Sequence, residues 1–373
     1  MATITGPIDV SALRARLDRA AQAAGQAGVD ALLISPGSDL RYLIGAGGDS
    51  FERLTCLALP VDGTPRLVVP KLEQPGYAGI PTDELGVEVV TWVDGEDPYA
   101  LVKAALKGSR VAVADMMPAL HTLKLGDAIG GPQSLAGPIL RELRMRKDAA
   151  EIAALRKAGA AIDRVHARMG EFLRVGRTER EVARDIAAAI VEEGHTVADF
   201  VIVGSGPNGA SPHHRDSDRV VGAGEVVVID IGGPVAEGYN SDSTRTYVMG
   251  EPAHDDVWDT YAVLQAAQQA AVDAVKPGVT CEEVDAAART VIADAGFGEF
   301  FVHRTGHGIG LDVHEEPYIV SGNALPLEPG MSFSVEPGIY LPGRWGARIE
   351  DIVVATADGV ESFNNRPHEL VVL

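Results

Sequence analysis

The stretch GAGEVVVIDIG, residues 222–232, has a counterpart in LEPGMSFSVEPG, residues 327–338. In both, a glycine precedes a run of β-forming residues that ends at an acidic residue, Asp230 in the first and Glu336 in the second. Further along, GYNSD ends in Asp242 and GARIE ends in Glu350, at nearly the same separation. Two carboxylates per half therefore fall at matching places. This pattern predicts an internal repeat, in which the second half of the domain is a diverged copy of the first.

The helices expected ahead of these stretches support the repeat. GRTEREVARDIAAAIVEEG, residues 176–194, and GVTCEEVDAAARTVIADAG, residues 278–296, have the same length and end in a glycine. Each opens with a threonine and a glutamate at the spacing of a capping box: Thr178 with Glu181, and Thr280 with Glu283. Another helical pattern precedes each of them. The first of these begins near Lys147 and carries one apolar stripe through to Phe172.

The first part of the chain alternates helix and strand. We expect a helix over 11–27 and strands over 31–35, 54–60, 66–70 and 111–114. Asp62-Gly63 lies between the second and third strands and indicates a hairpin. No cluster of ligands or nucleophiles occurs here, and the charged run RELRMRK, residues 141–147, closes the region. The sequence thus predicts a small α/β domain over 1–141 and a second domain over 147–373.

Composition limits the function classes. With 373 residues, 46% hydrophobic and 23% charged, the chain is expected to be globular with two domains. A net charge of −21 disfavours nucleic acid and anionic membrane surfaces as partners. No apolar run is long enough to cross a membrane, and the opening residues lack the basic start and apolar stretch of a secretory signal. Cys56 and Cys281 lie far apart, as in a reducing compartment, so we expect a cytoplasmic protein.

The four matched carboxylates are the chemically informative residues. Singly, Asp230 reads as a turn cap, Asp242 as a turn residue, and Glu350 as a partner of Arg348. Four carboxylates that converge from two related halves would repel one another and take up protons unless cations neutralised them. A pair of divalent metal ions meets this demand, with two of the carboxylates bridging the ions.

Histidines supply a further ligand type. HRTGHGIGLDVHEEP, residues 303–317, carries His303, His307 and His314, and the glycines around His307 allow a close approach of the backbone. Any one of these histidines could instead be a loop residue bonded to the backbone. In the first half, SGPNGASPHH places His213 and His214 ahead of Asp230, as His307 lies ahead of Glu336. The pattern favours a metal site.

This set of motifs resembles the metal-dependent exopeptidases of the pita-bread fold, specifically the prolidase and aminopeptidase P branch. The resemblance covers nearly the whole chain and rests on RMRKDAAEIAALRKA, PNGASPHH, VVIDIGG, YNSDSTRT, HRTGHGIGLDVHEEP, VEPGIY and RIED, in the order of the family. Methionine aminopeptidases are similar only in the second domain, and creatine-hydrolysing relatives lack the metal carboxylates. The resemblance implies a creatinase/prolidase-type N-terminal α/β domain and an α+β pita-bread C-terminal domain with an internal pseudo-two-fold repeat.

Carried over residue by residue, the resemblance implies five metal ligands: Asp230, Asp242, His307, Glu336 and Glu350. Asp242 and Glu350 would bridge two divalent ions. Asp230 would chelate one ion, and His307 and Glu336 would bind the other. Oxygen-rich ligation suits Mn²⁺, with Co²⁺, Fe²⁺ or Zn²⁺ as alternatives.

The resemblance also implies roles in catalysis. Two ions that share a water lower its pKa, and Glu336 would take the proton of that water and pass it to the leaving nitrogen. His213 and His314 would donate hydrogen bonds to the oxyanion, with His213 preferred over its neighbour because it directly follows a proline. His303 and Arg348 would position the substrate or the ligands.

The activity implied is hydrolysis of Xaa-Pro peptide bonds, most like that of a bacterial Xaa-Pro dipeptidase, by a homodimer. One alternative is an Xaa-Pro aminopeptidase (aminopeptidase P), which acts on longer peptides. From another class, the chain could be a pita-bread protein that binds a partner without catalysis, although all five ligand positions carry competent side chains. Residues alone do not separate the two peptidases.

Overall fold

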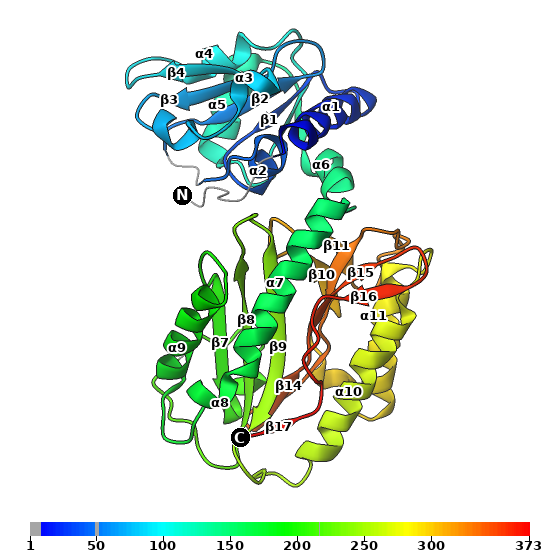
Figure 1. Cartoon of the computed structure of the whole chain (residues 1–373). Coiled ribbons are helices and arrows are strands. Elements are labelled where there is room, and N and C mark those ends of the chain that lie inside the picture. The colour runs from blue at the N-terminus through cyan, green and yellow to red at the C-terminus, as the bar shows by residue number, and fades with distance from the viewer. Residues whose placement is uncertain (1–8, 49–51, 216) are drawn as a thin grey trace. The chain divides into compact units, whose positions relative to one another are not determined.

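The computed structural model describes residues 9–48, 52–215 and 217–373. It divides the chain into two compact units, Met1–Arg144 and Met145–Leu373 (Figure 1). Most of the opening segment, in which we expect no secretory signal, lies outside the described residues. No described helix is both long enough and apolar enough to cross a membrane.

The first unit is built on a six-stranded sheet in the part that the structure describes. Its strands are β1 Ala31–Ile34, β2 Cys56–Pro60, β3 Arg66–Pro70, β4 Glu88–Trp92, β5 Val111–Val113 and β6 Gln133–Leu135. They lie in the order β4-β3-β2-β1-β5-β6. The predicted hairpin is present, because β2 pairs antiparallel with β3 across Asp62-Gly63. Every residue of β1 and β2 is buried, as expected of a sheet covered on both faces.

Helices cover this sheet. They are α1 Val10–Gln26, α2 Ser38–Ile44, α3 Thr82–Leu85, α4 Pro98–Lys103, α5 Ala119–Ile129 and α6 Gly137–Arg144, with a 3-10 turn η1 at Gln74–Tyr77. Helix α1 begins where the Asp9 side chain accepts from the backbone N–H groups of Ser11 and Ala12, and it buries Leu13 and Leu17 against the sheet. The unit is therefore the α/β domain that the alternating pattern predicts.

The first half of the second unit packs helices on an antiparallel sheet. Its elements are α7 Ala149–Ala167, α8 Met169–Phe172, α9 Glu179–Glu192, β7 Phe200–Ser205, the 3-10 turn η2 Gly206–Ala210, β8 Val226–Pro234 and β9 Asn240–Val248. The predicted single helix from Lys147 to Phe172 is wrong in one respect, because α7 ends at Ala167 and the stripe continues on the separate turn α8. Strand β17, Val371–Val372, adds parallel to β9.

The second half repeats this plan. It contains α10 Val257–Ala274, α11 Cys281–Asp294, η3 Gly298–Phe300, β10 Gly306–Gly308, β11 Glu315–Ile319, β12 Ser332–Val335, β13 Gly338–Leu341, β14 Trp345–Arg348, β15 Asp351–Ala355 and β16 Val360–Ser362. The antiparallel series β10-β12-β15 corresponds to β7-β8-β9; α7, α8 and α9 precede the first series, and α10 and α11 precede the second. In Figure 1, α7, α8 and α9 lie on one side of the strands and α10 and α11 on the other.

Both capped helices form as the sequence predicts. The Thr178 side chain accepts from the backbone N–H of Glu181, whose carboxylate accepts from the N–H of Thr178. Thr280 and Glu283 make the same reciprocal pair in α11. The glycines that follow the two helices have φ values of 116° and 87°, which an L side chain rarely adopts: Gly194 and Gly296. The repeat is thus visible at the level of individual hydrogen bonds.

Side chains alternate between the two faces along strands β8 and β9, and this alternation decides which of them face the interior between the two halves. Ile229 and Ile231 pack with α7 and α9, so Asp230 must face the opposite side of the sheet. The register pairs Asp230 with Thr244, and Gly232 with Asp242. Both aspartates therefore lie on the face turned away from the helices.

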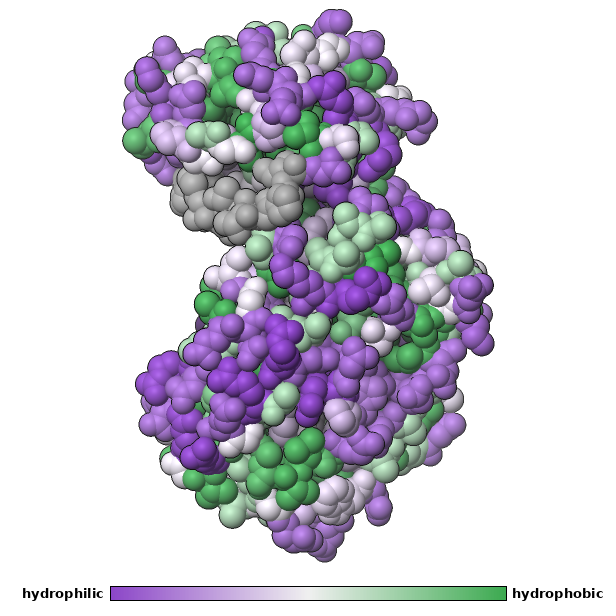
Figure 2. Space-filling model, viewed as in Figure 1, coloured by the Kyte–Doolittle hydropathy of each residue, from purple (hydrophilic) through white to green (hydrophobic). Residues whose placement is uncertain are grey.

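The visible surface of the protein is mainly hydrophilic (Figure 2). In the view of Figure 2, most visible side chains of both units are hydrophilic and the hydrophobic ones occur in small groups.

Candidate metal centre

Four buried or nearly buried carboxylates meet on the interior face of the second unit. Ligand atoms of Asp230, Asp242 and Glu350 all lie within 4.8 Å of one another, and so do those of His307, Glu336 and Glu350. A third overlapping group joins Asp242 and His307 with His314. The two principal groups share Glu350, and each half of the repeat contributes to the cluster. This is the arrangement that two adjacent cations require.

Two oxygens in this cluster lack the partner that burial demands. Asp230 is 7% exposed and Glu350 is 1% exposed. Oδ1 of Asp230 and Oε1 of Glu350 are buried without a hydrogen bond from any residue that the structure describes, while the other oxygen of each accepts one. An unpartnered carboxylate oxygen is costly inside a protein. Divalent cations fit this donor set, because they would satisfy both oxygens at once.

His307 has the tautomer of a metal ligand. Its Nδ1 lies 3.1 Å from the carbonyl oxygen of Gly308, which can only accept, so Nδ1 carries the proton. Nε2 therefore presents its lone pair, 3.3 Å from Oε1 of Glu336 and 3.6 Å from Oδ2 of Asp242. Metal-binding histidines commonly donate their other ring N–H in this way.

Burial and mutual repulsion raise the proton affinity of the carboxylates. The pKa of Asp242 is raised by burial and by Glu350, Asp230 and Glu336. Burial and Glu336 likewise raise the pKa of Glu350 well above its ordinary value. Burial raises the pKa of Glu336 to about 7, although Arg348 lowers it. Burial, followed by His314, holds the pKa of His307 well below its ordinary value. The site therefore favours neutral groups unless cations compensate the charge.

Glycines beside His307 are required by close packing. A Cβ atom at Gly306 would collide with the carbonyl group of Ser334, and one at Gly308 would collide with the backbone of Glu316. The short strand β10 therefore fits between β11 and β12 only because it has no side chains at these two positions. The sequence expectation for the glycines of this segment is confirmed.

Arg348 is buried behind the candidate metal ligands, where it donates several hydrogen bonds, and it is not exposed to a substrate. It is 2% exposed. Its Nη2 donates to Oδ2 of Asp230 at 2.5 Å, its Nε to Oγ1 of Thr244 at 3.0 Å, and its Nη1 to the hydroxyl of Tyr340 at 2.7 Å. Both Nη atoms also lie 3.4 Å from the carbonyl oxygen of Pro212. Glu350 does not pair with Arg348 and instead accepts from the Thr244 hydroxyl at 2.7 Å.

His303 is linked to Arg348 through the hydroxyl of Tyr340. Its Nδ1 donates to the carbonyl oxygen of Arg304 at 2.7 Å, so its Nε2 accepts from the hydroxyl of Tyr340 at 2.8 Å. Burial, and then the charge of Arg348, lower the pKa of His303 to about 3. His303 is therefore a neutral acceptor in a chain that runs from Arg348 through Tyr340.

The two remaining histidines are exposed at the centre. The ring of His314 meets that of His307 edge-on, with 4.1 Å between the ring centroids. His213 is exposed as well, and its charge contributes to lowering the pKa of both His303 and His314. Its neighbour His214 points elsewhere and donates to Glu179. The structure thus gathers the residues that the sequence nominates around one region.

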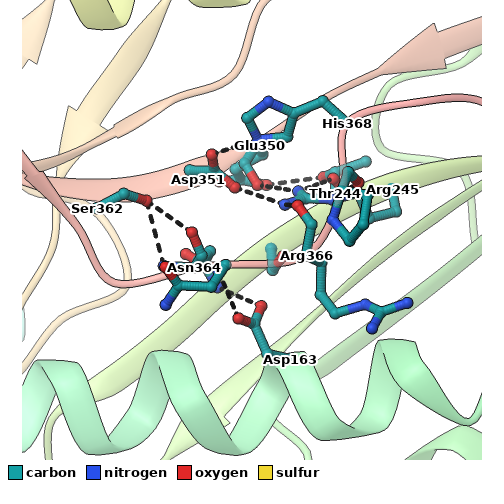
Figure 3. A network of polar contacts seen from close by, with 12 residues as sticks. Asp163, Thr244, Arg245, Glu350, Asp351, Ser362, Asn364, Arg366 and His368 are labelled. Atoms are coloured by element: carbon teal, nitrogen blue, oxygen red, sulfur yellow. Dashed lines mark hydrogen bonds and ion pairs between the residues drawn. The ribbon is translucent and has the colours of Figure 1, made fainter.

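A second network supports the ligand-bearing strands from behind. Arg245 follows Thr244 on β9 and faces α7, where its Nη2 donates to Oδ1 of Asp351 at 2.7 Å and its Nη1 to the carbonyl oxygen of Glu350 at 2.6 Å. Asp351 also accepts from His368 at 2.6 Å. Figure 3 shows this network, with Asp163 of α7 bonded to the segment that carries Asn364. Polar contacts therefore fix Glu350 on both sides of the backbone.

Four residues of the site have no role in the sequence analysis: Thr244, Arg245, Ser334 and Tyr340. Ser334 donates to Glu336 at 3.0 Å. A local signal exists for two of them, because Thr244 and Ser334 each lie two residues from a nominated carboxylate and so share its face of the strand. Arg245 offers no comparable signal, since its partners Glu350 and Asp351 are more than 100 residues away, and Tyr340 is not spaced two residues from a nominated carboxylate.

With this geometry in place, comparison with known proteins defines the class. Residues 153–357 match the model described as Metallopeptidase family M24, and residues 16–146 match the Creatinase/Prolidase N-terminal domain. The first match covers more than half of the chain, so the chain belongs to metallopeptidase family M24. Its second unit has the pita-bread fold, and the resemblance and fold class predicted from the sequence are confirmed.

Particular relatives are similar over nearly the full length. The chain is 60% identical over 367 residues to the probable dipeptidase PepE of Mycobacterium tuberculosis, with 98% of each chain covered. It is 38% identical to the Xaa-Pro dipeptidase of Lactobacillus delbrueckii subsp. lactis, over 93% of this chain and 95% of the relative. The crystal structure of dipeptidase PepE from Mycobacterium ulcerans is 62% identical and has a TM-score of 0.94, with 98% and 99% of the two chains covered.

Proposed function

We propose that this metallopeptidase is an Xaa-Pro dipeptidase (prolidase) whose centre holds two divalent metal ions. The observation that carries the proposal is the cluster of four carboxylates and one imidazole, in which Asp230 and Glu350 each keep a buried oxygen free of protein partners. The relatives named as dipeptidases support the reaction class, since they match over nearly the whole chain. Asp230, Asp242, His307, Glu336 and Glu350 would hold the two ions.

The ions supply Lewis acidity, which lowers the pKa of water and polarises a peptide carbonyl. Side chains of the protein would carry out proton transfer and stabilise the developing charge. Glu336 lies beside His307 and Glu350 in the cluster, where its carboxylate would take a proton from attacking water and return it to the leaving nitrogen. His213 and His314 are exposed at the centre, where they donate hydrogen bonds to the carbonyl oxygen as negative charge develops on it.

The remaining nominated residues hold this constellation in place. Arg348 orients Asp230 through its shortest contact and stays buried, so we assign it to positioning of the ligands. His303 fixes Tyr340, which in turn holds Arg348. A proline nitrogen forms a tertiary amide without an N–H, so recognition of Xaa-Pro bonds must depend on the ring and the carboxylate of the substrate.

Paired substrates separate the dipeptidase from the aminopeptidase. With Mn²⁺ added, we expect Ala-Pro to be hydrolysed faster than Ala-Pro-Ala, measured by release of free alanine. Preferential cleavage of the tripeptide would assign the chain to the Xaa-Pro aminopeptidases instead.

Replacement of Glu336 tests the catalytic assignment and the non-catalytic alternative together. We expect Glu336→Gln to lower kcat at least about a hundredfold, whereas undiminished hydrolysis by that variant would remove the assignment. Elemental analysis of both proteins establishes whether metal is lost at the same time.

Three finer properties belong to the same proposal. Oxygen-rich ligation favours Mn²⁺ as the resident ion, which elemental analysis before and after chelation tests. The two cysteines, Cys56 and Cys281, are free and buried, which supports a reducing, cytoplasmic location. A homodimer follows from the family resemblance, and light scattering of the purified protein measures it.

A further inference from the structure

The side chain of His213 is exposed, but the residues on both sides of it are held. Among residues 9–48, 52–215 and 217–373, none forms a hydrogen bond or ion pair with this imidazole. Pro212 is held through its carbonyl oxygen, 3.4 Å from both Nη atoms of Arg348. His214 is held through Nε2, which lies 2.8 Å from Oε2 of Glu179. The imidazole of His213, which we assign to the substrate, thus has no partner among the described residues, whereas the residues on both sides of His213 are held in place.

The carboxylate of Glu179 accepts hydrogen bonds from residues along the segment that carries His213. Its Oε1 accepts from both the N–H and the hydroxyl of Ser205 at 2.8 Å, where β7 ends. Its Oε2 accepts from the hydroxyl of Ser217 at 2.7 Å, and both oxygens contact Nδ2 of Asn208 at 3.0 and 3.1 Å. Segment 205–215 is therefore fastened near its start, near its middle and next to His213 by one side chain.

Burial of the Glu179 carboxylate costs free energy, so its hydrogen bonds show which part of the fold it stabilises. Glu179 is 0% exposed, and a buried carboxylate is unfavourable unless donors surround it. Helix α9 does not need it as a cap, because Thr178 and Glu181 already form the capping box. The donors that surround Glu179 come instead from the segment and from Ser217. The carboxylate thus serves the segment rather than its own helix.

The second half of the repeat uses a comparable device. Asp285 on α11 is 1% exposed, and it accepts from the N–H of Thr305 at 3.0 Å and from its hydroxyl at 2.8 Å. Thr305 lies between His303 and His307. In both halves, a buried carboxylate of the capped helix therefore anchors the stretch that brings histidines to the centre.

We propose that Glu179 is a positioning residue for the peptidase reaction, which fixes segment 205–215 so that the imidazole of His213 is presented to the substrate carbonyl. The inference rests on the proposed function, because His213 acts on substrate only if the chain hydrolyses peptides. Among the described residues, the partners of the Glu179 carboxylate are Ser205, Asn208, His214 and Ser217, and none of these is a candidate metal ligand.

A double-mutant cycle on Ala-Pro hydrolysis tests the proposal. The proteins are wild type, Glu179→Gln, His213→Ala and the double variant, all measured for kcat and KM with saturating Mn²⁺. The amide that replaces the carboxylate would turn an N–H₂ group toward donors, which releases the segment. We expect Glu179→Gln to lower kcat about tenfold or more with unchanged metal content, and to have no further effect when His213 is already alanine.

A matched control lies on the same helix. Glu181→Ala removes the capping-box carboxylate and should lower the melting temperature while leaving kcat and KM of Ala-Pro hydrolysis unchanged. If Glu179→Gln does not fold, His214→Ala removes a single donor and serves in the same cycle, whereas His214→Gln keeps an N–H donor and should restore part of kcat.

The outcomes separate the two proposals. Absence of any Xaa-Pro hydrolysis by the wild-type protein would overturn the proposed function. If the wild type is active, the inference is overturned when His213→Ala is fully active, or when Glu179→Gln lowers kcat by the same factor with and without His213. Loss of the Glu179 effect in the His213→Ala background supports it.

Discussion

The buried oxygens of Asp230 and Glu350 that lack protein partners give this centre its chemical character. A carboxylate that accepts one hydrogen bond and leaves its other oxygen bare in the interior is held in a state that favours a cation. The pKa values of Asp242 and Glu350 are raised for a related reason, because protonation is the other way to remove the cost of buried negative charges that repel one another. Loss of charge at one of these positions should therefore have opposite effects on metal binding and on the stability of the metal-free chain.

Glu350→Gln tests this opposition. The carbonyl of the new amide could still accept from Thr244, while the repulsion with Asp230 and Glu336 would disappear. We expect less bound Mn²⁺ per chain and a kcat/KM for Ala-Pro lower by at least about a hundredfold. In excess chelator, the variant should melt no lower than the wild type. Elemental analysis and thermal unfolding measure the two effects, and a variant with full metal content would contradict the ligand assignment.

Thr244 permits a finer test, because its hydroxyl joins two elements of the centre. It donates to Glu350 and accepts from Arg348. Thr244→Val keeps the shape but removes both bonds, so we expect Mn²⁺ affinity to fall about 10–100-fold, measured by calorimetric titration. Thr244→Ser retains the hydroxyl and should bind Mn²⁺ nearly as the wild type does. Equal affinities for the valine and serine variants would show that the hydroxyl has no such role.

At the scale of elements, the contact between η2 and β14 places the first-half loop over the second-half ribbon. A Cβ atom at Gly346 would collide with the carbonyl group of Gly209, which lies in η2 just ahead of His213. Arg348, two residues beyond Gly346 on β14, then meets Pro212. The absence of one side chain therefore allows the two halves of the repeat to close on the histidine segment.

Gly346→Ala should separate these elements. We expect a loss of about 1–3 kcal/mol in the free energy of unfolding, because the backbone must move to admit the methyl group. Catalysis should weaken as well, since the shift carries His213 away from the substrate. Chemical denaturation and Ala-Pro kinetics measure the two effects. Gly170→Ala, where a Cβ would meet only ordinary contacts, is the control and should change neither strongly. Unchanged kinetics in Gly346→Ala would contradict the account.

Contacts between near neighbours are the ones that the sequence reveals. The two capping boxes join residues three apart, and the alternation of VVVID places Asp230 on a definite face, so both follow from local pattern. The matched carboxylates could be nominated because the repeat supplies a second copy for comparison. The pairing of Arg348 with Asp230 spans 118 positions, and no periodicity encodes it. The break between α7 and α8 does not follow from the pattern either, because the apolar stripe continues across it.

At the scale of the whole molecule, buried neutral histidines couple folding to pH. Burial lowers the pKa of His166 to about 3 and that of His195 to about 4, from an ordinary value of 6.5. Between pH 4 and 6.5 the unfolded chain therefore binds more protons than the folded one, so stability rises with pH across this window. As the pH falls below 6.5, each such histidine costs up to about 1.4 kcal/mol per pH unit.

His195→Gln isolates this contribution. The glutamine can still bond to Ser241, the present partner of Nε2, but it does not titrate. We expect the variant to lose less stability than the wild type between pH 7 and pH 5, with urea denaturation in excess chelator as the measurement. The chelator removes any effect of metal release. Parallel curves for the two proteins would show that His195 does not titrate as described.

The matched halves of the second unit also bear on ancestry. Asp230 and Asp242 come from one half, whereas His307, Glu336 and Glu350 come from the other, so neither half could form the cage by itself. A forebear with a single copy would have needed to self-associate about a two-fold axis to bring such a set of ligands together. The link between β9 and α10 would then be the seam at which a gene fusion made that ancient pair into one polypeptide.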